Sequence, residues 1–194
     1  MYLFFAVLTT VIKAAIIDGL GQRAHIFSKM DLIIDGYNLI GADDGLRGAL
    51  EPKRNWLTQK LVAYQRRKAF NIVLVFDGWR SGQAQETKER RDGVTVVYSR
   101  IGEKADAVVM RLAREKGSGC VVVTSDREIR KAVERFGAVA IYSSEFNQIL
   151  RGLDDAAGED EADEVDEQRS QRGNPNRIGK AERKRQERLK KLRL

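Results

Sequence analysis

Short apolar runs rich in β-branched residues recur through the middle of the chain. There are five such runs: Leu32–Ile34, Asn71–Phe76, Val94–Tyr98, Cys120–Val123 and Ala138–Tyr142. Continuous rather than alternating apolar runs are typical of strands that are buried on both faces of a parallel sheet. The pattern therefore predicts five strands.

Apolar positions with helical spacing separate most of these runs. Leu57, Leu61 and Tyr64 fall at i, i+4 and i+7 between the first two runs, and similar patterns follow the third, fourth and fifth. This alternation predicts a three-layer α/β domain over residues 30–153, with a five-stranded, mainly parallel sheet flanked by helices. Trp56, Tyr64 and Phe136 fit the helical spacing and are expected in the core. Residues 80–93 are polar and are predicted to form an exposed basic loop or a short helix.

The ends of the chain differ from this domain. Residues 1–29 begin with an apolar stretch that is shorter than the ~20 residues of a membrane span and lacks the basic start of a signal peptide. A second methionine, Met30, directly precedes the first strand, so translation is expected to begin there. A short membrane anchor, a packed extra helix and a disordered segment are the alternatives.

The C-terminal tail consists of an acidic block followed by a basic block. Residues 154–168 contain nine acids and no base, whereas residues 169–194 contain eleven bases and two acids. Neither block has enough apolar residues to fold alone. We therefore expect an acidic linker over 154–175 and a basic tail over 176–194. The tail is either solvated or helical, and it could attract phosphate backbones.

Composition restricts the chemistry. The sequence carries a formal charge of +7 and contains one cysteine, Cys120, and one histidine, His25. A single cysteine excludes an intramolecular disulfide and fits a reducing, cytoplasmic compartment. Zinc sites of the Cys/His type are excluded too, and a catalytic triad would need His25, which lies in the N-terminal extension. Any metal must be bound by oxygen ligands.

Aspartates follow three of the predicted strands. Asp35, Asp77 and Asp126 stand at or just after strand ends, and Asp106 begins the helix after the third strand. The carboxyl ends of parallel strands open onto one edge of a sheet, where ligands bind. Clustered carboxylates repel one another unless cations hold them together, and oxygen ligands suit Mg²⁺ or Mn²⁺.

Each aspartate also has a local structural explanation. Asp35-Gly36 and Asp77-Gly78 are common turn dipeptides, and Asp106 in a first helical turn is favoured by the helix dipole. Residues 125–128 (SDRE) match a capping box with Ser125 as the N-cap. The convergence of four acids on one edge favours a functional site. The motifs of Rossmann and P-loop nucleotide binding are absent.

In sequence order, these motifs resemble a known family. Residues 30–41 (MDLIIDGYNLIG) are similar to the opening of the NYN domains, a PIN-like nuclease group, and of their bacterial YacP-like branch in particular. Four shorter pieces follow in the same order: VFDG at 75–78, EKAD at 103–106, VTSD at 123–126 and YSSEF at 142–146. The resemblance covers about residues 30–153.

The resemblance implies a PIN-like sheet and metal-dependent cleavage of RNA. The implied catalytic residues are Asp35, Asn38, Asp77, Asp106 and Asp126. Of these, Asp35 and Asp126 would bind one Mg²⁺ or Mn²⁺ directly. Asp106, with Asp77 acting through water, would complete the site or hold a second ion. The implied supporting residues are Glu103, Thr124 and Ser125. The water would attack phosphorus in line and leave a 5′-phosphate and a 3′-hydroxyl.

RNA contacts are expected from the segment that follows the second strand. Trp79 could stack on an unpaired base, and four basic residues could contact phosphates: Arg80, Lys88, Arg90 and Arg91. We therefore expect an endoribonuclease acting on single-stranded RNA, in mRNA decay or RNA processing. The main alternative is a non-cleaving RNA-binding module that associates with ribosomes through the basic tail. A PIN-type toxin and a small-molecule phosphoryl-transfer enzyme are weaker alternatives.

Overall fold

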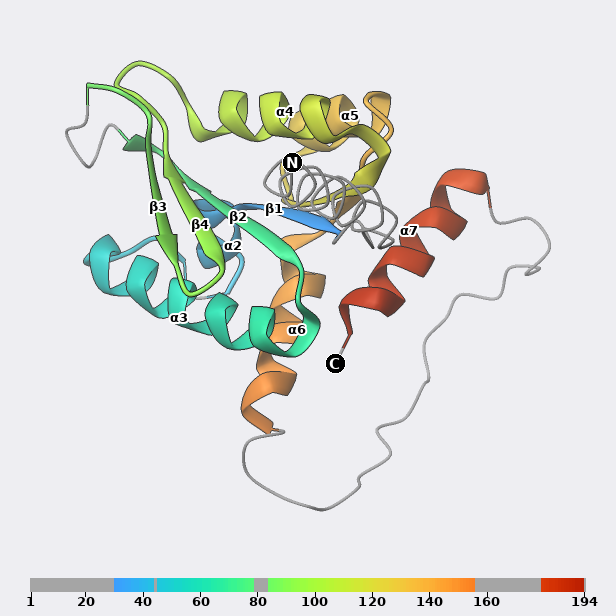
Figure 1. Cartoon of the computed structure of the whole chain (residues 1–194), viewed down its shortest axis with the longest axis horizontal. Coiled ribbons are helices and arrows are strands. Elements are labelled where there is room, and N and C mark those ends of the chain that lie inside the picture. The colour runs from blue at the N-terminus through green and yellow to red at the C-terminus, as the bar shows by residue number, and fades with distance from the viewer. Residues whose placement is uncertain (1–29, 44, 79–83, 156–178, 194) are drawn as a thin grey trace, which may run out of the picture.

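The computed structural model describes residues 30–43, 45–78, 84–155 and 179–193 (Figure 1). The expectations for residues 1–29, for most of the acidic linker and for Trp79 and Arg80 lie outside these residues. Within the described ranges, no helix is long and apolar enough to span a membrane.

Six strands form one sheet in the order β3-β4-β2-β1-β5-β6. Their bounds are β1 (Asp31–Asp35), β2 (Asn71–Phe76), β3 (Thr87–Arg91), β4 (Val94–Tyr98), β5 (Cys120–Val123) and β6 (Val139–Ile141). All neighbouring strands are parallel except β3 and β4. The predicted α/β class and the five predicted strands are confirmed, and β3 is an additional strand.

Strand β3 shows that the expectation of a loop or short helix over residues 80–93 was wrong for its second half. β3 pairs antiparallel with β4, with Thr87 opposite Tyr98 and Arg91 opposite Val94. Its sequence, TKERR, has no apolar residue, and four of its five residues are exposed. Charged side chains on an edge strand oppose pairing with other chains. A polar composition of this kind is typical of a loop, so no sign of a strand is visible in the sequence here.

Helices cover both faces of the sheet. One layer contains α2 (Gly36–Gly41), α3 (Leu50–Lys68), α6 (Ser143–Asp155) and α7 (Lys180–Leu192), and the other contains α4 (Ala105–Lys116) and α5 (Arg127–Arg135). Figure 1 shows α4 and α5 on the opposite side of the sheet from α3 and α6. A short 3₁₀ turn, η2 (Gly117–Gly119), connects α4 to β5.

The strands supply side chains to two separate cores because alternate residues point to opposite faces. Leu32 and Ile34 of β1 belong to the core that contains Leu61 of α3, whereas Ile33 belongs to the core that contains Val109 of α4. Both sides of the central strands are therefore buried, as the continuous apolar runs predicted.

The aromatic residues expected in the core differ in their exposure. Tyr64 is fully buried and Phe136 is partly buried, but Trp56 is 47% exposed. The expectation for Trp56 was wrong because it precedes the buried Leu57 by one position, which turns it about 100° around the helix. Its ring instead lies 5.5 Å from the Lys60 ammonium.

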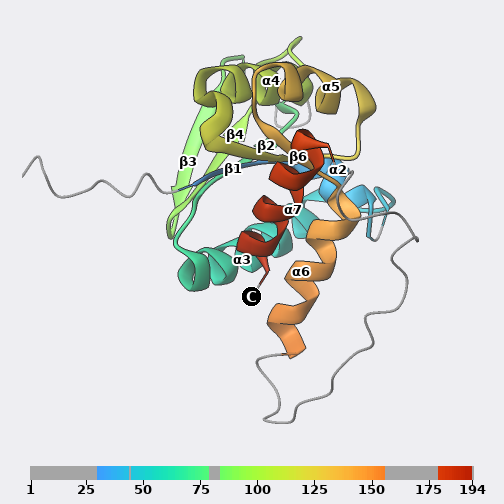
Figure 2. The ribbon, with the colours of Figure 1, turned by 90° about the vertical axis from the view of Figure 1, so that its right-hand side faces the viewer.

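The basic end of the chain forms α7, which packs across β6 near α6 and α3 (Figure 2). The Leu192 side chain is fully buried, and its backbone oxygen accepts a 2.7 Å hydrogen bond from the Tyr64 hydroxyl. Arg185 of α7 forms an ion pair with Glu145 of α6. Few leucines are enough to dock this basic helix because the domain supplies the opposing apolar surface.

Candidate active site

The four aspartates predicted from the sequence interact at the carboxyl ends of the central strands. Asp35 ends β1, Asp77 follows β2, and Asp126 follows β5 on the other side of β1, while Asp106 lies in the first turn of α4. Burial is the main cause that raises the pKa values of Asp35 and Asp106. The negative charges of Asp106 and Asp77 raise the pKa of Asp35 further, and those of Asp126 and Asp77 do the same for Asp106. The fold thus places all four within electrostatic reach.

Asp35 is the most buried of these carboxylates, with only 6% of its surface exposed. Burial, opposed by the hydrogen bond from the Asn38 backbone N–H, raises the pKa of Asp35 to about 6. That N–H lies 3.2 Å from Oδ1, and the Thr124 hydroxyl donates to Oδ2 over 3.4 Å. Asp35 is therefore held in one orientation, in an environment that disfavours its charge unless a cation is near.

The glycines that follow Asp35 and Asp77 leave no room for a side chain, because other parts of the domain pack directly against their backbone. Gly36 begins α2 rather than a turn, and a Cβ there would overlap the Phe76 ring. A Cβ on Gly78 would overlap the backbone oxygen of Ser99. The turn explanation for Asp35-Gly36 was therefore wrong, because the glycine is required by packing of the start of α2 against the end of β2.

Asp77 fixes the start of α4. Its Oδ1 accepts a 2.6 Å hydrogen bond from the Ala105 backbone N–H. The Ser99 hydroxyl accepts from the Gly78 N–H at 3.0 Å and donates to the Glu103 backbone oxygen at 2.6 Å. These bonds tie the β4–α4 connection to the end of β2 and so hold Asp106 near Asp35.

Asp126, rather than Ser125, is the N-cap of α5. Its Oδ1 accepts from the backbone N–H groups of Glu128 and Ile129, at 2.7 and 3.1 Å. Its own N–H donates to the Thr124 hydroxyl at 3.2 Å. The prediction of Ser125 as the N-cap was wrong by one position, because the Asp126 carboxylate caps the helix. The Ser125 hydroxyl instead accepts a hydrogen bond from the Ser143 backbone N–H.

Asn38 connects three segments of the site. Its Oδ1 accepts 2.7 Å hydrogen bonds from both the Ser125 backbone N–H and the Ser143 hydroxyl. These bonds join α2 to the β5–α5 connection and to the start of α6. Ser143 is completely buried and lies 105 positions from Asn38, so only its place in the YSSEF motif marked it in the sequence.

The donor set fits a hard divalent cation. The residues brought together supply carboxylate, amide and hydroxyl oxygens, which Mg²⁺ and Mn²⁺ prefer. Among the described residues, no three His, Cys, Asp or Glu side chains are placed to hold a metal ion together. Mg²⁺ usually keeps several waters and is bound through one or two carboxylates plus substrate phosphates. The residues are thus compatible with such an ion, with water and substrate supplying the other ligands.

The remaining predicted site residues form ion pairs or are exposed. The Glu103 carboxylate pairs with Arg100 at 3.2 Å. Lys88 and Arg90 are exposed on β3, and Lys88 pairs with Glu86. Arg91 lies at the end of β3 opposite the start of β4, and therefore farthest from the strand ends that carry the aspartates. It also pairs with Glu89.

An aromatic cluster beside the aspartates was missed by sequence reasoning. The rings of Tyr37 and Tyr98 pack on Phe76, with centroid distances of 5.0 and 5.8 Å. Arg54 donates to the Tyr37 hydroxyl at 3.4 Å and lies 5.7 Å from the Tyr98 ring. Nothing in the sequence pairs these residues, because they come from separate elements.

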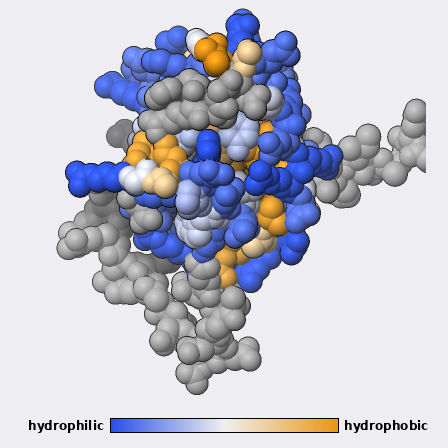
Figure 3. Space-filling view, turned by 90° about the vertical axis from the view of Figure 1, so that its left-hand side faces the viewer, coloured by the Kyte–Doolittle hydropathy of each residue, from blue (hydrophilic) through white to orange (hydrophobic). Residues whose placement is uncertain are grey.

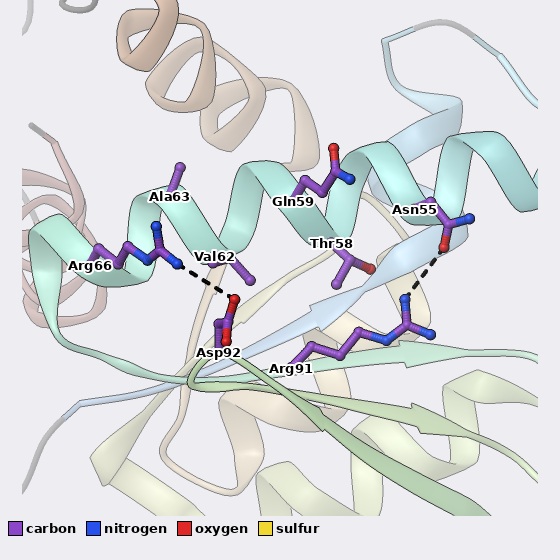
Figure 4. A pocket seen from close by; sticks show the side chains of 8 residues that line it. All are labelled: Asn55, Thr58, Gln59, Val62, Ala63, Arg66, Arg91 and Asp92. Carbon is purple, nitrogen blue, oxygen red and sulfur yellow. Dashed lines mark hydrogen bonds and ion pairs between the residues drawn. The ribbon is translucent and has the colours of Figure 1, made fainter.

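The aspartates lie apart from the main cavity beside the sheet. A cavity of about 610 Å³ lies between α3 and the β3–β4 hairpin and is bordered by the Arg66–Asp92 and Asn55–Arg91 contacts, but none of the four aspartates lines it (Figure 4). The carboxyl end of β2 faces the left of Figure 1, and Figure 3 shows that side as mainly hydrophilic with separate hydrophobic patches. A mainly hydrophilic surface beside clustered carboxylates suits a polar ligand.

Comparison with known proteins identifies relatives of this fold. Two crystal structures of Rae1 (YacP) from Bacillus subtilis, one of them a mutant, are 26% identical in sequence to this chain. The TM-scores are 0.54 for the mutant and 0.53 for the other structure. The alignments cover 65% of this chain and 77% and 76% of the Rae1 chains. No significant match was found among curated proteins.

The sequence model of the YacP-like NYN domain matches residues 32–194. The match extends through the charged tail, beyond residue 153, where the resemblance in the sequence motifs ended. It also includes α7, which packs on the domain. The protein is therefore a member of the YacP-like NYN domain family and has a nuclease-type fold.

Proposed function

We propose that the protein is an endoribonuclease that uses Mg²⁺ or Mn²⁺ to hydrolyse phosphodiester bonds of single-stranded RNA. The observation that carries the proposal is the coupling of four aspartate charges at one edge of a nuclease-type sheet. A buried carboxylate with a raised pKa and several acidic neighbours is typical of a functional site.

Asp35 and Asp126 would bind the ion directly and Asp106 would complete the site, with Asp77 acting through water. When bound, the ion would polarise the phosphodiester and increase the acidity of the attacking water. Thr124 and the Asn38 backbone hold the Asp35 carboxylate in a fixed orientation. No side chain of the protein needs to form a covalent intermediate.

The chemistry of the reaction is a hydrolysis. The oxygen of water forms a bond to phosphorus while the bond from phosphorus to the 3′ oxygen breaks. One proton of the water is released from the nucleophile, and the leaving 3′ oxygen takes up a proton from solvent. The products are a 5′-phosphate and a 3′-hydroxyl. mRNA decay and RNA processing are the settings proposed for this activity.

The second candidate is an RNA-binding module that does not cut and docks on ribosomes through its basic tail. It is favoured by the absence, in the described part of the chain, of three acidic side chains placed to hold a metal together. The exposed bases on α7, among them Lys180, Lys190 and Lys191, would supply the phosphate contacts.

Cleavage of mixed single-stranded RNA by the full chain tests the proposal. The purified protein is incubated with Mg²⁺ or Mn²⁺ and, in parallel, with EDTA. We expect metal-dependent cleavage that is lost in Asp35→Asn and retained in Glu115→Gln, a matched change of an exposed acid on α4. Binding of RNA without cleavage under every condition would favour the second candidate.

A further inference from the structure

A basic cleft lies between α5, β6 and α7, apart from the aspartates. Its volume is about 580 Å³. Four bases line it, against two acids: Arg130, Lys180, Lys184 and Arg185 against Glu134 and Glu182. The C-terminal helix forms one wall of the cleft, so the cleft exists only when α7 is docked.

Arg130 is the unusual residue in this cleft. Its guanidinium carbon lies 3.7 Å from the centroid of the Tyr142 ring, and its Nε is buried without a hydrogen-bond partner. In the described part of the chain, no carboxylate pairs with Arg130, whereas Arg185 pairs with Glu145 and Glu182. A partly buried guanidinium with unused N–H groups gains most from an anionic acceptor.

Two residues of the cleft, Arg130 and Tyr142, are connected to residues of the acidic edge. Arg130 lies one helical turn from Asp126, and its backbone N–H donates to the Asp126 backbone oxygen at 3.0 Å. Tyr142 directly precedes Ser143, whose hydroxyl is bonded to Asn38. A strand bound across the aspartates would therefore pass Tyr142 and Arg130 next.

We propose that this cleft binds a backbone phosphate of single-stranded RNA beside the scissile bond, with Arg130 as the main ligand. The planar guanidinium can donate two parallel hydrogen bonds to a phosphate, and the Tyr142 ring, 38% exposed, supports it by stacking. This inference rests on the proposed function, because it assumes RNA at the acidic edge. It assigns α7 to the RNA-binding surface as one wall of the cleft.

RNA binding in EDTA tests the assignment without cleavage. Arg130→Ala is compared with Arg114→Ala, which removes another arginine that lies over an aromatic ring, Phe136, at 5.7 Å and away from the aspartates. We expect Arg130→Ala to weaken binding about 10-fold and Arg114→Ala to leave it unchanged. Loss of one phosphate contact should also reduce the slope of log K against log salt by about 0.7. Arg130→Lys should restore the slope but only part of the affinity.

Several results would overturn the proposal. One is equal RNA affinity of Arg130→Ala and Arg114→Ala. Another is weaker binding by Arg130→Ala with an unchanged salt slope, which would mean that Arg130 only packs on Tyr142. A mononucleotide or inorganic phosphate that binds the wild type as tightly as RNA, and as sensitively to Arg130→Ala, would make the cleft a small-anion site. If Arg130→Ala has the expected effects but the wild type never cleaves RNA, the proposed function fails while the RNA contact stands.

Discussion

Replacing Asp35 by asparagine should stabilise the metal-free protein while removing its activity. Burial raises the pKa of Asp35 from 3.8 to about 6, so the folded state holds a proton more tightly than the unfolded state does. Stability then falls as pH rises through the window from about 4 to 6, and the ionised group remains unfavourable above it. A pKa difference of one corresponds to about 1.4 kcal/mol. The ionised Asp35 carboxylate therefore lowers the free energy of unfolding by at most roughly 3 kcal/mol.

Asparagine keeps the shape of the side chain and its acceptor for the Asn38 N–H but carries no charge. We expect a net gain of about 2 kcal/mol at pH 7.5, because some hydrogen-bond strength is lost with the charge. For a domain of this size, that gain raises Tm by about 4 to 8 °C. The gain should become small near pH 4, where the wild-type carboxyl is protonated in the folded state and nearly half protonated in the unfolded state.

Thermal unfolding in EDTA at pH 4 and pH 7.5 measures this effect, with Glu115→Gln as the matched exposed control. The control should change Tm by no more than about 1 °C. A lower Tm for Asp35→Asn at pH 7.5, or a gain in Tm that does not depend on pH, would contradict a raised pKa at Asp35. Saturating Mg²⁺ should reduce the difference in Tm between Asp35→Asn and the wild type, since a cation near Asp35 stabilises only the wild type.

Other substitutions test the contacts that hold the site. Gly78→Ala places a Cβ against the Ser99 backbone oxygen, which cannot move aside like a flexible side chain, and should lower stability by about 1 to 3 kcal/mol in chemical denaturation. Tyr64→Phe removes the buried hydrogen bond to the Leu192 backbone oxygen, so it should lower the free energy of unfolding by about 1 kcal/mol and expose α7 to limited proteolysis. Unchanged proteolysis would show that this bond does not hold the helix. Asn38→Ala leaves two donors without their acceptor and should reduce cleavage at least ~10-fold while RNA binding in EDTA persists; full activity would contradict its positioning role.

The sequence predicts the central part of the fold because its signals there are local. Strands buried on both faces need continuous apolar runs, and such runs are visible without any knowledge of tertiary structure. β3 escaped detection because pairing with β4, and not burial, holds its polar residues in the sheet. The docking of α7 escaped detection too, because its apolar residues are few and the surface that buries Leu192 belongs to distant segments.

The candidate site was predictable to a smaller extent. The position of aspartates at strand ends follows from the topology of parallel sheets, so their convergence could be anticipated. The bonds that orient them could not, because Asn38 and Ser143 are joined across 105 positions and the Asp126 carboxylate competes with Ser125 for one helix cap. The contact between Arg130 and Tyr142 was also missed, because it joins α5 to the residue after β6 and Arg130 belongs to none of the motifs.

Metal-assisted hydrolysis at the aspartates is best tested by the end groups of RNA fragments that the purified full chain produces. A single-stranded oligonucleotide is incubated with Mg²⁺, and the products are analysed by mass spectrometry, with EDTA and Asp126→Asn as controls. We expect 5′-phosphate and 3′-hydroxyl ends that appear only with metal and only with the wild type. Fragments with 2′,3′-cyclic phosphates, or cleavage that persists in EDTA, would contradict metal-assisted hydrolysis at these aspartates.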